Sequence, residues 1–334
     1  MNVTILNPNA VYSYHVHAKP MLRNVVLLTG VNRSGTTLIG NITGSLQNVE
    51  YAFEPWIFHS LPMLVASRQM TSSAAEQLLN TYCGEYYLES LLGRNINVRP
   101  SDDTNIWKRK SEEEIHWRFT HLKDRWDAKK CTHECDHILA IKAANYGPFL
   151  GQFLAVFPHA KIIHIVRHPF SVAASIVKKG WVDLKQLQDL EGLPIKKKMV
   201  TSRGELFLPW WLQEEDAEEF LQMSEMSRAL YGWCYIITKT EERCKSLGLH
   251  AQHPQYLEIR FEDLLGDPTF CTDRISHFMN AAITGPTREL IRNVRKDPLL
   301  KIQDVDPDQL REKDRQKITE WMERHGYTHE AKRT

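Results

Sequence analysis

The chain has 334 residues, of which 42% are hydrophobic and 25% are charged, and its formal net charge is +1. This balance excludes a general electrostatic attraction to nucleic acid or to an anionic membrane surface, so any anion-binding site must be local. No apolar run approaches the roughly 20 residues of a membrane span, and the N-terminus lacks a signal-peptide pattern. Six scattered cysteines are typical of reduced intracellular thiols, and we expect a cytoplasmic protein without a membrane span.

The segment Val25–Ser45 contains the first strong local pattern. The apolar run Val25–Leu28 predicts a buried parallel strand, Gly30 and Gly35 bracket a tight loop, and a helix follows. The G-x-x-x-x-G-T-T spacing is that of a phosphate-binding P-loop in which Thr36 replaces the usual lysine. Backbone N–H groups at a helix N-terminus favour an anion, and Arg33 adds a fork of donors from within the loop. The alternative is an ordinary strand–helix turn without a ligand.

A second strand is predicted at Val49–Phe53, and it ends at Glu54-Pro55. A residue before proline is restricted to extended backbone, so we expect Glu54 to project from the strand end. Ligands of open parallel sheets gather at the carboxyl ends of the strands, which would place Glu54 at the same edge as the loop. A surface carboxylate without a function is the alternative.

Two further strands are predicted to end in cationic residues. The third, 137–142, places Lys142 at its carboxyl end, and the fourth, 160–166, is followed by Arg167. Ser171 and Ser175 are four residues apart on the next helix, so they share one face and predict a second anion site with Arg167. Nucleoside triphosphatases need a carboxylate near this point to hold Mg²⁺, whereas this chain supplies an arginine. Strands that alternate with helices predict an α/β fold with a P-loop-type central parallel sheet and helices on both faces.

These motifs together resemble those of a known family. The segments TGVNRSGTTL (29–38) and AKIIHIVRHPFSVAAS (160–175) resemble the two nucleotide signatures of sulfotransferases that use 3′-phosphoadenosine 5′-phosphosulfate (PAPS). In that family the first loop holds the 5′-phosphosulfate, and an arginine and a serine eight residues later hold the 3′-phosphate. The resemblance implies that the nucleotide is bound by Arg33, Ser34, Gly35, Thr36, Thr37, Arg167 and Ser175.

Shorter segments extend the resemblance. YAFEPW (51–56) is similar to the F-E-P segment of carbohydrate sulfotransferases, whose glutamate is the base, and Lys142 resembles the strand-end lysine of tyrosylprotein-type enzymes. YLEIRFEDLL (256–265) and WMERHGY (321–327) resemble later family segments. The chain departs from the pattern at Ser171, where many members have aspartate, and it lacks the glycine-rich basic C-terminal loop of the small-phenol branch.

The resemblance implies an O-sulfotransferase that moves the sulfuryl group of PAPS to an acceptor hydroxyl and releases adenosine 3′,5′-bisphosphate (PAP). Glu54 would act as base, with Arg33 and Lys142 stabilising charge and no metal required. The F-E-P segment favours a carbohydrate acceptor. A P-loop small-molecule kinase using Mg·ATP and a catalytically inactive nucleotide-binding module are the alternatives, and no sequence feature fixes the oligomeric state.

We expect a single domain at 23–330, preceded by an N-terminal extension at 1–22. Residues 94–136 and 180–228 are interpreted as insertions on the acceptor side, although their tryptophans and charge runs also fit ordinary surface helices and solvated faces. Cys131, Cys135 and His137 bear metal-binding side chains at close spacing. A structural zinc site needs a second ligand pair further along the chain, and since no clean pair follows, we expect no metal.

Overall fold

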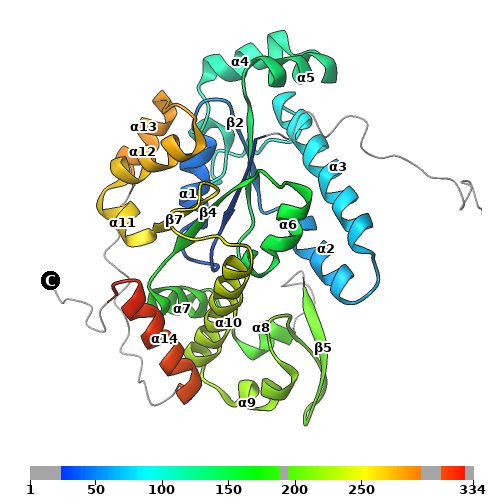
Figure 1. Ribbon diagram of the computed structural model, residues 1–334, viewed down its shortest axis with the longest axis vertical. Coiled ribbons are helices and arrows are strands. Elements are labelled where there is room, and N and C mark those ends of the chain that lie inside the picture. The colour runs from blue at the N-terminus through cyan, green and yellow to red at the C-terminus, as the bar shows by residue number, and fades with distance from the viewer. Residues whose placement is uncertain (1–23, 189–194, 295–309, 328–334) are drawn as a thin grey trace, which may run out of the picture.

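The computed structural model describes residues 24–188, 195–294 and 310–327, so the expected extension at 1–22 lies outside the described residues. A five-stranded parallel sheet in the order β2-β3-β1-β4-β7 forms the centre (Figure 1). Its strands are β1 (Val25–Thr29), β2 (Val49–Phe53), β3 (Ile138–Lys142), β4 (Lys161–Val166) and β7 (Tyr256–Arg260). The predicted α/β fold with a central parallel sheet is confirmed, and the first four strands lie where the apolar runs predicted them.

Helices cover both faces of this sheet, which explains why its strands are almost continuously apolar. On one face lie α1 and α11 to α13, and on the other lie α2, α3 and α6 (Figure 1). Their bounds are α1 (Thr36–Gly44), α2 (Ile57–Ala66), α3 (Ser72–Leu91), α6 (Leu150–Val156), α11 (Phe261–Gly266), α12 (Pro268–Met279) and α13 (Gly285–Arg292).

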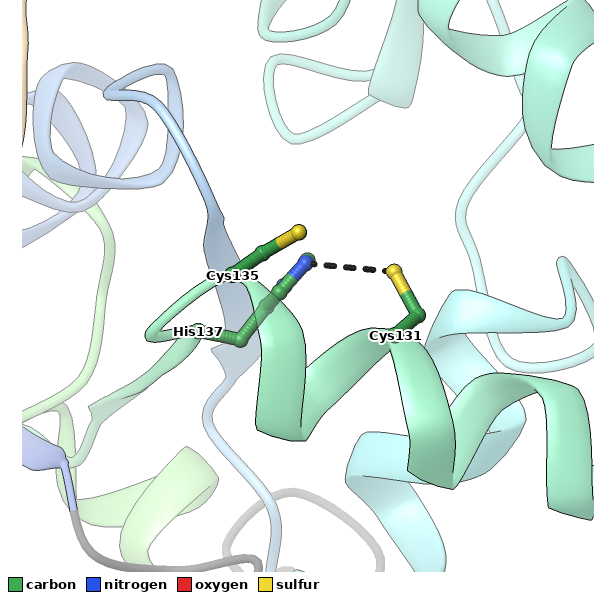
Figure 2. Close-up of side chains that lie close together, drawn as sticks. All are labelled: Cys131, Cys135 and His137. Atoms are coloured by element: carbon green, nitrogen blue, oxygen red, sulfur yellow. Dashed lines mark hydrogen bonds between the residues drawn. The ribbon is translucent and has the colours of Figure 1, made fainter.

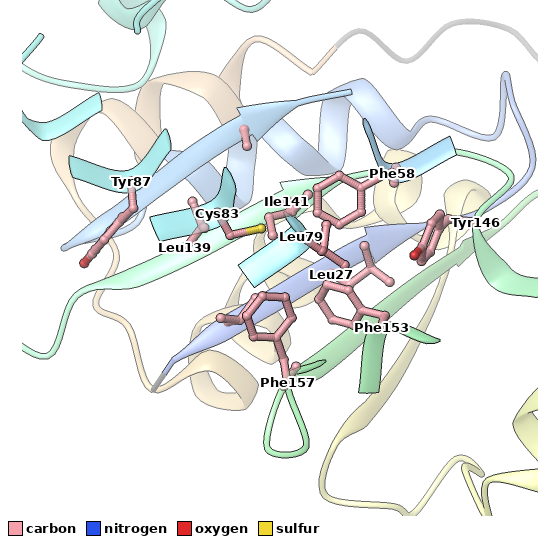
Figure 3. Close-up of a cluster of buried hydrophobic side chains, with 14 of the residues drawn as sticks. Leu27, Phe58, Leu79, Cys83, Tyr87, Leu139, Ile141, Tyr146, Phe153 and Phe157 are labelled. Atoms are coloured by element: carbon pink, nitrogen blue, oxygen red, sulfur yellow. The ribbon is translucent and has the colours of Figure 1, made fainter. Parts of the chain in front are cut away.

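The two faces hold separate hydrophobic clusters because successive strand residues point to opposite sides. Leu27 of β1 and Ile141 of β3 pack against Phe58 and Phe153, which come from α2 and α6 (Figure 3). Leu28, one residue further along β1, points to the other face and joins the cluster that includes Ile39 and Ile42 of α1. Both clusters exclude water from the sheet, so the strand ends are held at fixed positions.

A second group of elements lies next to the carboxyl ends of the strands. A third hydrophobic cluster joins α7, α10 and α14, and a fourth joins a β-hairpin to the short helices beside it. These elements are α7 (Pro169–Lys178), α8 (Leu184–Gln188), β5 (Lys196–Thr201), β6 (Gly204–Pro209), α9 (Ala217–Gln222), α10 (Glu225–Ser246) and α14 (Glu312–Arg324). Short 3₁₀ turns complete the described structure at Ile106–Lys108, Gly147–Phe149 and Glu214–Asp216.

The hairpin was not predicted from the sequence. The segment from Gly180 to Phe220 lacks a clear period, yet β5 and β6 pair antiparallel within it. Lys197 and Lys198 lie on β5 and form ion pairs with Glu214 and Glu205, at 3.4 and 2.7 Å. From Lys198 to Thr201 exposed and buried side chains alternate, as in a strand with one packed face, and the three consecutive lysines hid that period in the sequence.

The two helices α4 (Glu112–His121) and α5 (Arg125–Glu134) lie at the other end of the sheet (Figure 1). Helix α5 ends four residues before β3 begins, so it lies beside the amino ends of the strands. Helix α4 contacts β2 through Arg118, which bonds to Glu50. No helix within the described ranges is long and apolar enough to cross a membrane.

The chain adds strands first on one side of β1 and then on the other. After β1 it crosses to β2 at one edge and returns through β3, and it then continues to β4 and β7 on the other side of β1. The carboxyl end of β1 is therefore the topological switch point, where open α/β sheets bind their ligands. The loop after β1 and the ends of β2, β3 and β4 all meet at this edge, because the four strands are parallel and in register.

Candidate active site

The loop between β1 and α1 folds tightly around its two glycines. A Cβ on Gly30 would lie 2.3 Å from the carbonyl oxygen of Ile165 on β4, and a Cβ on Gly35 would lie 2.2 Å from the ring of Phe261. Gly35 also has a φ of 92°, in the left-handed region that side chains disfavour. Both positions therefore require glycine, one because β4 approaches closely and one because the backbone turns into the helix.

Contacts from neighbouring loops hold this loop in place. Asn32 N–H donates to the side-chain oxygen of Asn145 at 2.9 Å, and Asn145 N–H donates back to the Gly30 carbonyl at 2.8 Å. Arg167 donates from Nη1 to the Arg33 carbonyl at 2.9 Å. The loop is therefore positioned by residues that follow β3 and β4.

Donor groups gather at the start of α1. Helix α1 begins at Thr36, so the N–H groups of its first turn have no partner within the helix, an arrangement that favours an anion. Ser34 Oγ is buried and has no hydrogen-bond partner among the described residues. A donor without a protein partner, next to helix N–H groups and two cationic side chains, fits a phosphate or sulfate ester.

Lys142 connects this loop to Glu54. Its Nζ lies 2.9 Å from Glu54 Oε1, and it donates to Thr37 Oγ1 at 3.1 Å. The lysine side chain is 4% exposed, whereas that of Glu54 is 33% exposed. Burial lowers the pKa of Lys142, and Glu54 acts in the opposite sense by favouring the charged ammonium. One ammonium group therefore bridges the loop and a carboxylate that remains open to solvent.

Glu54 lies at the predicted strand end, but its backbone conformation corrects the expectation. The proline that follows predicts an extended residue, whereas the φ of Glu54 is 42°, in the left-handed region. In this conformation Glu54 contacts Lys142 twice. Its N–H donates to the Lys142 carbonyl at 3.0 Å, and its carboxylate pairs with the Lys142 ammonium. A left-handed residue before proline is strained, and such strain is concentrated at functional sites.

A contact between Arg33 and Ser175 joins the loop to the second predicted group. Arg33 Nε donates to Ser175 Oγ at 3.0 Å, across a gap of 142 residues in the chain. Ser175 lies on α7, the helix that follows β4 and Arg167. Ser171 lies one turn earlier on α7, and its Oγ is fully buried without a hydrogen-bond partner among the described residues, as that of Ser34 is. Its place in the second anion site stays a prediction.

Aromatic rings next to the cations were not predicted from the sequence. The Arg167 guanidinium lies 4.4 Å from the ring centroid of Phe261, and the Arg33 guanidinium lies 5.7 Å from that of Trp181. At such distances the ring faces attract a cation and fix its orientation. Phe261 immediately follows β7, and a position after a strand at the ligand-binding edge is the signal that points to it.

Glu262 secures the end of β4 from the same direction. Its carboxylate accepts a hydrogen bond from His168 N–H at 3.0 Å and another from Tyr327 O–H at 2.7 Å. The segments 256–265 and 321–327, which are far from the loop in the sequence, thus meet beside Arg167. These two segments hold the residues around Arg167 in place, and neither segment has a described hydrogen bond that it donates to the loop.

Comparisons with known proteins identify a family. The model of the sulfotransferase family matches residues 26–222, which is more than half of the chain. Among solved structures, the sulfotransferase domain of the Synechococcus PCC 7002 olefin synthase is 17% identical, covers 91% of this chain and 95% of its own, and has a TM-score of 0.49. A sulfotransferase domain from the curacin biosynthetic pathway is 16% identical, with coverages of 91% and 98% and a TM-score of 0.46. Mouse sulfotransferase SULT7A1, solved with PAP, is 13% identical, with coverages of 92% and 86% and a TM-score of 0.37. No curated protein sequence matches the chain significantly.

Proposed function

The chain belongs to the sulfotransferase family, and we propose that it transfers the sulfuryl group of PAPS to an acceptor hydroxyl and releases PAP. The observation that carries this proposal is the placement of Lys142 between the loop after β1 and Glu54, next to a loop that itself carries Arg33, at the carboxyl edge of the sheet. Family membership supplies the reaction class, and the three side chains supply the charges that the reaction needs.

PAPS supplies an activated sulfuryl group on a phosphate leaving group. The start of α1, with Ser34, Thr36 and Thr37, would hold the 5′-phosphosulfate, since the N–H groups at a helix N-terminus favour an anion and Ser34 Oγ has no protein partner among the described residues. Arg167 and Ser175 would hold the 3′-phosphate, because an arginine fork matches a phosphate in a bidentate manner. The loop also lacks the lysine that contacts the β- and γ-phosphates of ATP, which argues against the kinase alternative.

Glu54 would take the proton from the acceptor hydroxyl as the acceptor oxygen bonds to sulfur and the bond from sulfur to the 5′-phosphate oxygen breaks. Its exposed carboxylate supports this role, because an acceptor must reach it from solvent. Arg33 and Lys142 would stabilise the negative charge that develops on the sulfuryl oxygens and the leaving phosphate. Cations that are fixed by their contacts are suited to this, because they need no reorganisation during the reaction.

We propose a carbohydrate hydroxyl as the acceptor. The F-E-P resemblance supports this choice, and so do two exposed aromatic side chains that flank Glu54: Phe53 is 42% exposed and Trp56 is 70% exposed. The Phe53 ring also lies 4.2 Å from the Lys142 ammonium, which fixes it beside the site. Helices α4 and α5 are at the opposite end of the sheet, so we place the acceptor side at Phe53–Trp56 and at the segment 180–228.

Two measurements test the proposal. Calorimetry on the full chain should give binding of PAP without Mg²⁺ and much weaker binding of Mg·ATP. Transfer of radiolabelled sulfate from PAPS should then be measured on a panel containing an oligosaccharide, a phenol and an aliphatic alcohol. Tighter binding of Mg·ATP than of PAP would favour the kinase, and PAP binding without transfer to any acceptor would favour an inactive nucleotide-binding module.

A further inference from the structure

Two cysteines and a histidine, for which the sequence spacing predicts no metal, come together beside the amino end of β3 (Figure 2). Cys131 and Cys135 are four residues apart at the end of α5, so they lie on one face of the helix. Asp136 then has a φ of 46°, and this left-handed residue turns the chain back so that His137 meets the two thiols. Local backbone geometry therefore supplies the third side chain without a second distant pair.

The distances are close to those of a tetrahedral metal site. The two sulfur atoms and the imidazole nitrogen lie within 4.8 Å of one another, and Cys131 Sγ is 3.6 Å from His137 Nε2 (dashed in Figure 2). With bonds of about 2.3 Å to sulfur and about 2.0 Å to nitrogen, tetrahedral angles separate a sulfur and a nitrogen ligand by about 3.5 Å and two sulfurs by about 3.8 Å. The side chains thus need only small movements to coordinate one ion.

The chemistry of the three side chains selects the kind of ion. Two thiolates and one imidazole form a soft donor set, which suits Zn²⁺ and Cu⁺ and is poor for Mg²⁺ or Ca²⁺. Two thiolates also neutralise a divalent cation, and the two thiol protons leave to solvent when it binds. His137 is buried, Cys131 is half-buried and Cys135 is exposed, so one side of the cluster is open to a water molecule as the fourth ligand.

The other cysteines provide an internal comparison. Cys83, Cys234, Cys244 and Cys271 are each buried, and none of them belongs to a metal-ligand cluster within the described residues. Isolated buried cysteines act as small apolar side chains. Only the pair on α5 combines proximity to a second thiol, proximity to an imidazole and access from solvent.

We propose that Cys131, Cys135 and His137 bind one Zn²⁺ ion, which fastens the end of α5 to the start of β3. The Asn48 amide already donates to the Cys135 carbonyl at 2.7 Å, so the same turn is also attached to the chain before β2. Lys142 lies five residues beyond His137 along an extended chain, about 16 Å away. The ion would therefore stabilise the fold at the amino edge of the sheet and take no part in sulfuryl transfer.

Cobalt provides the direct test, because thiolate-bound Co²⁺ gives an intense charge-transfer absorption. The full chain should be reduced, freed of metal and titrated with Co²⁺. We expect one equivalent to bind with this absorption and Zn²⁺ to displace it. Cys131→Ser and His137→Gln should each weaken binding at least about 100-fold, since even indirect partners of metal ligands contribute 10–100-fold. Zn²⁺ should also raise the melting temperature of the unaltered protein and leave that of the Cys131→Ser variant unchanged.

Matched controls remove the same residue types elsewhere. Cys244→Ser changes a buried cysteine of α10, and His116→Gln changes an exposed histidine of α4. Both should bind Co²⁺ as the unaltered protein does. Failure of the fully reduced protein to give the absorption would overturn the proposal, as would unchanged affinity in a Cys131→Ser/Cys135→Ser double variant. A Cys131–Cys135 disulfide that, once reduced, takes up no cobalt would instead assign the pair to thiol oxidation.

Discussion

Two glutamates mark the two ends of β2, and each pairs with a buried cation. Glu50, near the amino end, bonds to Arg118 of α4 through both carboxylate oxygens, at 2.5 and 3.1 Å. Glu54, just past the carboxyl end, pairs with Lys142 at 2.9 Å. The side chain of Glu50 is 4% exposed and that of Glu54 is 33% exposed. The glutamate of the pair at the amino edge of the sheet is therefore closed to solvent, whereas that of the pair at the carboxyl edge is open to it.

The difference follows from what covers each pair. Burial by itself raises the pKa of Glu50, but Arg118 and Lys110 outweigh it and hold the pKa at about 2. Both oxygens are occupied, so Glu50 has no capacity left for a substrate. Glu54 has a single lysine partner and an exposed face, and that lysine also contacts the phosphate loop. We infer that exposure, and not the presence of an ion pair, separates the structural end of this sheet from the reactive end.

Glu54→Gln should have the largest effect. We expect kcat for sulfate transfer to fall by about 10²–10⁴-fold, because a neutral amide cannot accept the acceptor proton. The affinity for PAP, measured by calorimetry, should stay within about twofold, because the proposed nucleotide contacts are on other residues. Glu113→Gln on the exposed face of α4 is the matched control and should leave both quantities unchanged. Full activity of Glu54→Gln would remove Glu54 from the mechanism.

Arg118→Met should break the closed pair. Removing Arg118 leaves the buried Glu50 without its hydrogen-bonding partner and with only the weaker attraction of Lys110, so the free energy of unfolding should fall by about 3–5 kcal/mol, measured by urea denaturation. Turnover per folded molecule should not change, since the pair lies at the far edge of the sheet. The double variant Glu50→Leu/Arg118→Met should recover much of the lost stability, because no unpaired charge is left. A loss below about 1 kcal/mol would mean that the pair behaves like a surface salt bridge.

The reactive end is more predictable from sequence than the structural end. Spacing defines the loop, and parallel strands bring their carboxyl ends to one edge, so the sequence alone groups Glu54, Lys142 and Arg33. Their contacts with Thr37 and Ser175 follow from that grouping.

The structural end depends on contacts that sequence spacing does not encode. Glu50 and Arg118 are 68 residues apart, and neither belongs to a recognisable motif. The spacing around Cys131 predicts no metal because no second ligand pair follows, whereas a single left-handed residue completes the cluster by bringing His137 back. The left-handed Glu54 is missed for a similar reason: tertiary bonds to Lys142 override the local preference that proline imposes.

The closed pair also predicts how stability depends on pH. The pKa of Glu50 is lowered from 4.5 to about 2 on folding, so the unfolded chain binds a proton at a higher pH than the folded protein does. Its contribution is complete above about pH 5 and is lost as the pH falls through the folded pKa, with a total of at most about 3 kcal/mol. Other carboxylates titrate in the same range, so the measurement is the difference in unfolding free energy between the unaltered protein and Glu50→Gln from pH 6 to pH 2. A difference that does not shrink toward low pH would contradict the assignment.

Arg167→Ala should have the smallest effect of the four, and it tests the open end. Loss of a charge-assisted hydrogen bond to the 3′-phosphate should weaken PAP binding by about 1.5–3 kcal/mol, measured by calorimetry. Binding of adenosine 5′-monophosphate, which lacks that phosphate, should change much less, and this comparison separates direct contact from the support that Arg167 gives to the Arg33 carbonyl. Arg125→Ala on α5 removes an exposed arginine paired with Glu85 and Glu89 at the structural end, and it should leave PAP binding unchanged. Equal losses for the two nucleotides would show that Arg167 acts by holding the loop, and the 3′-phosphate would then have to be bound elsewhere at this edge of the sheet.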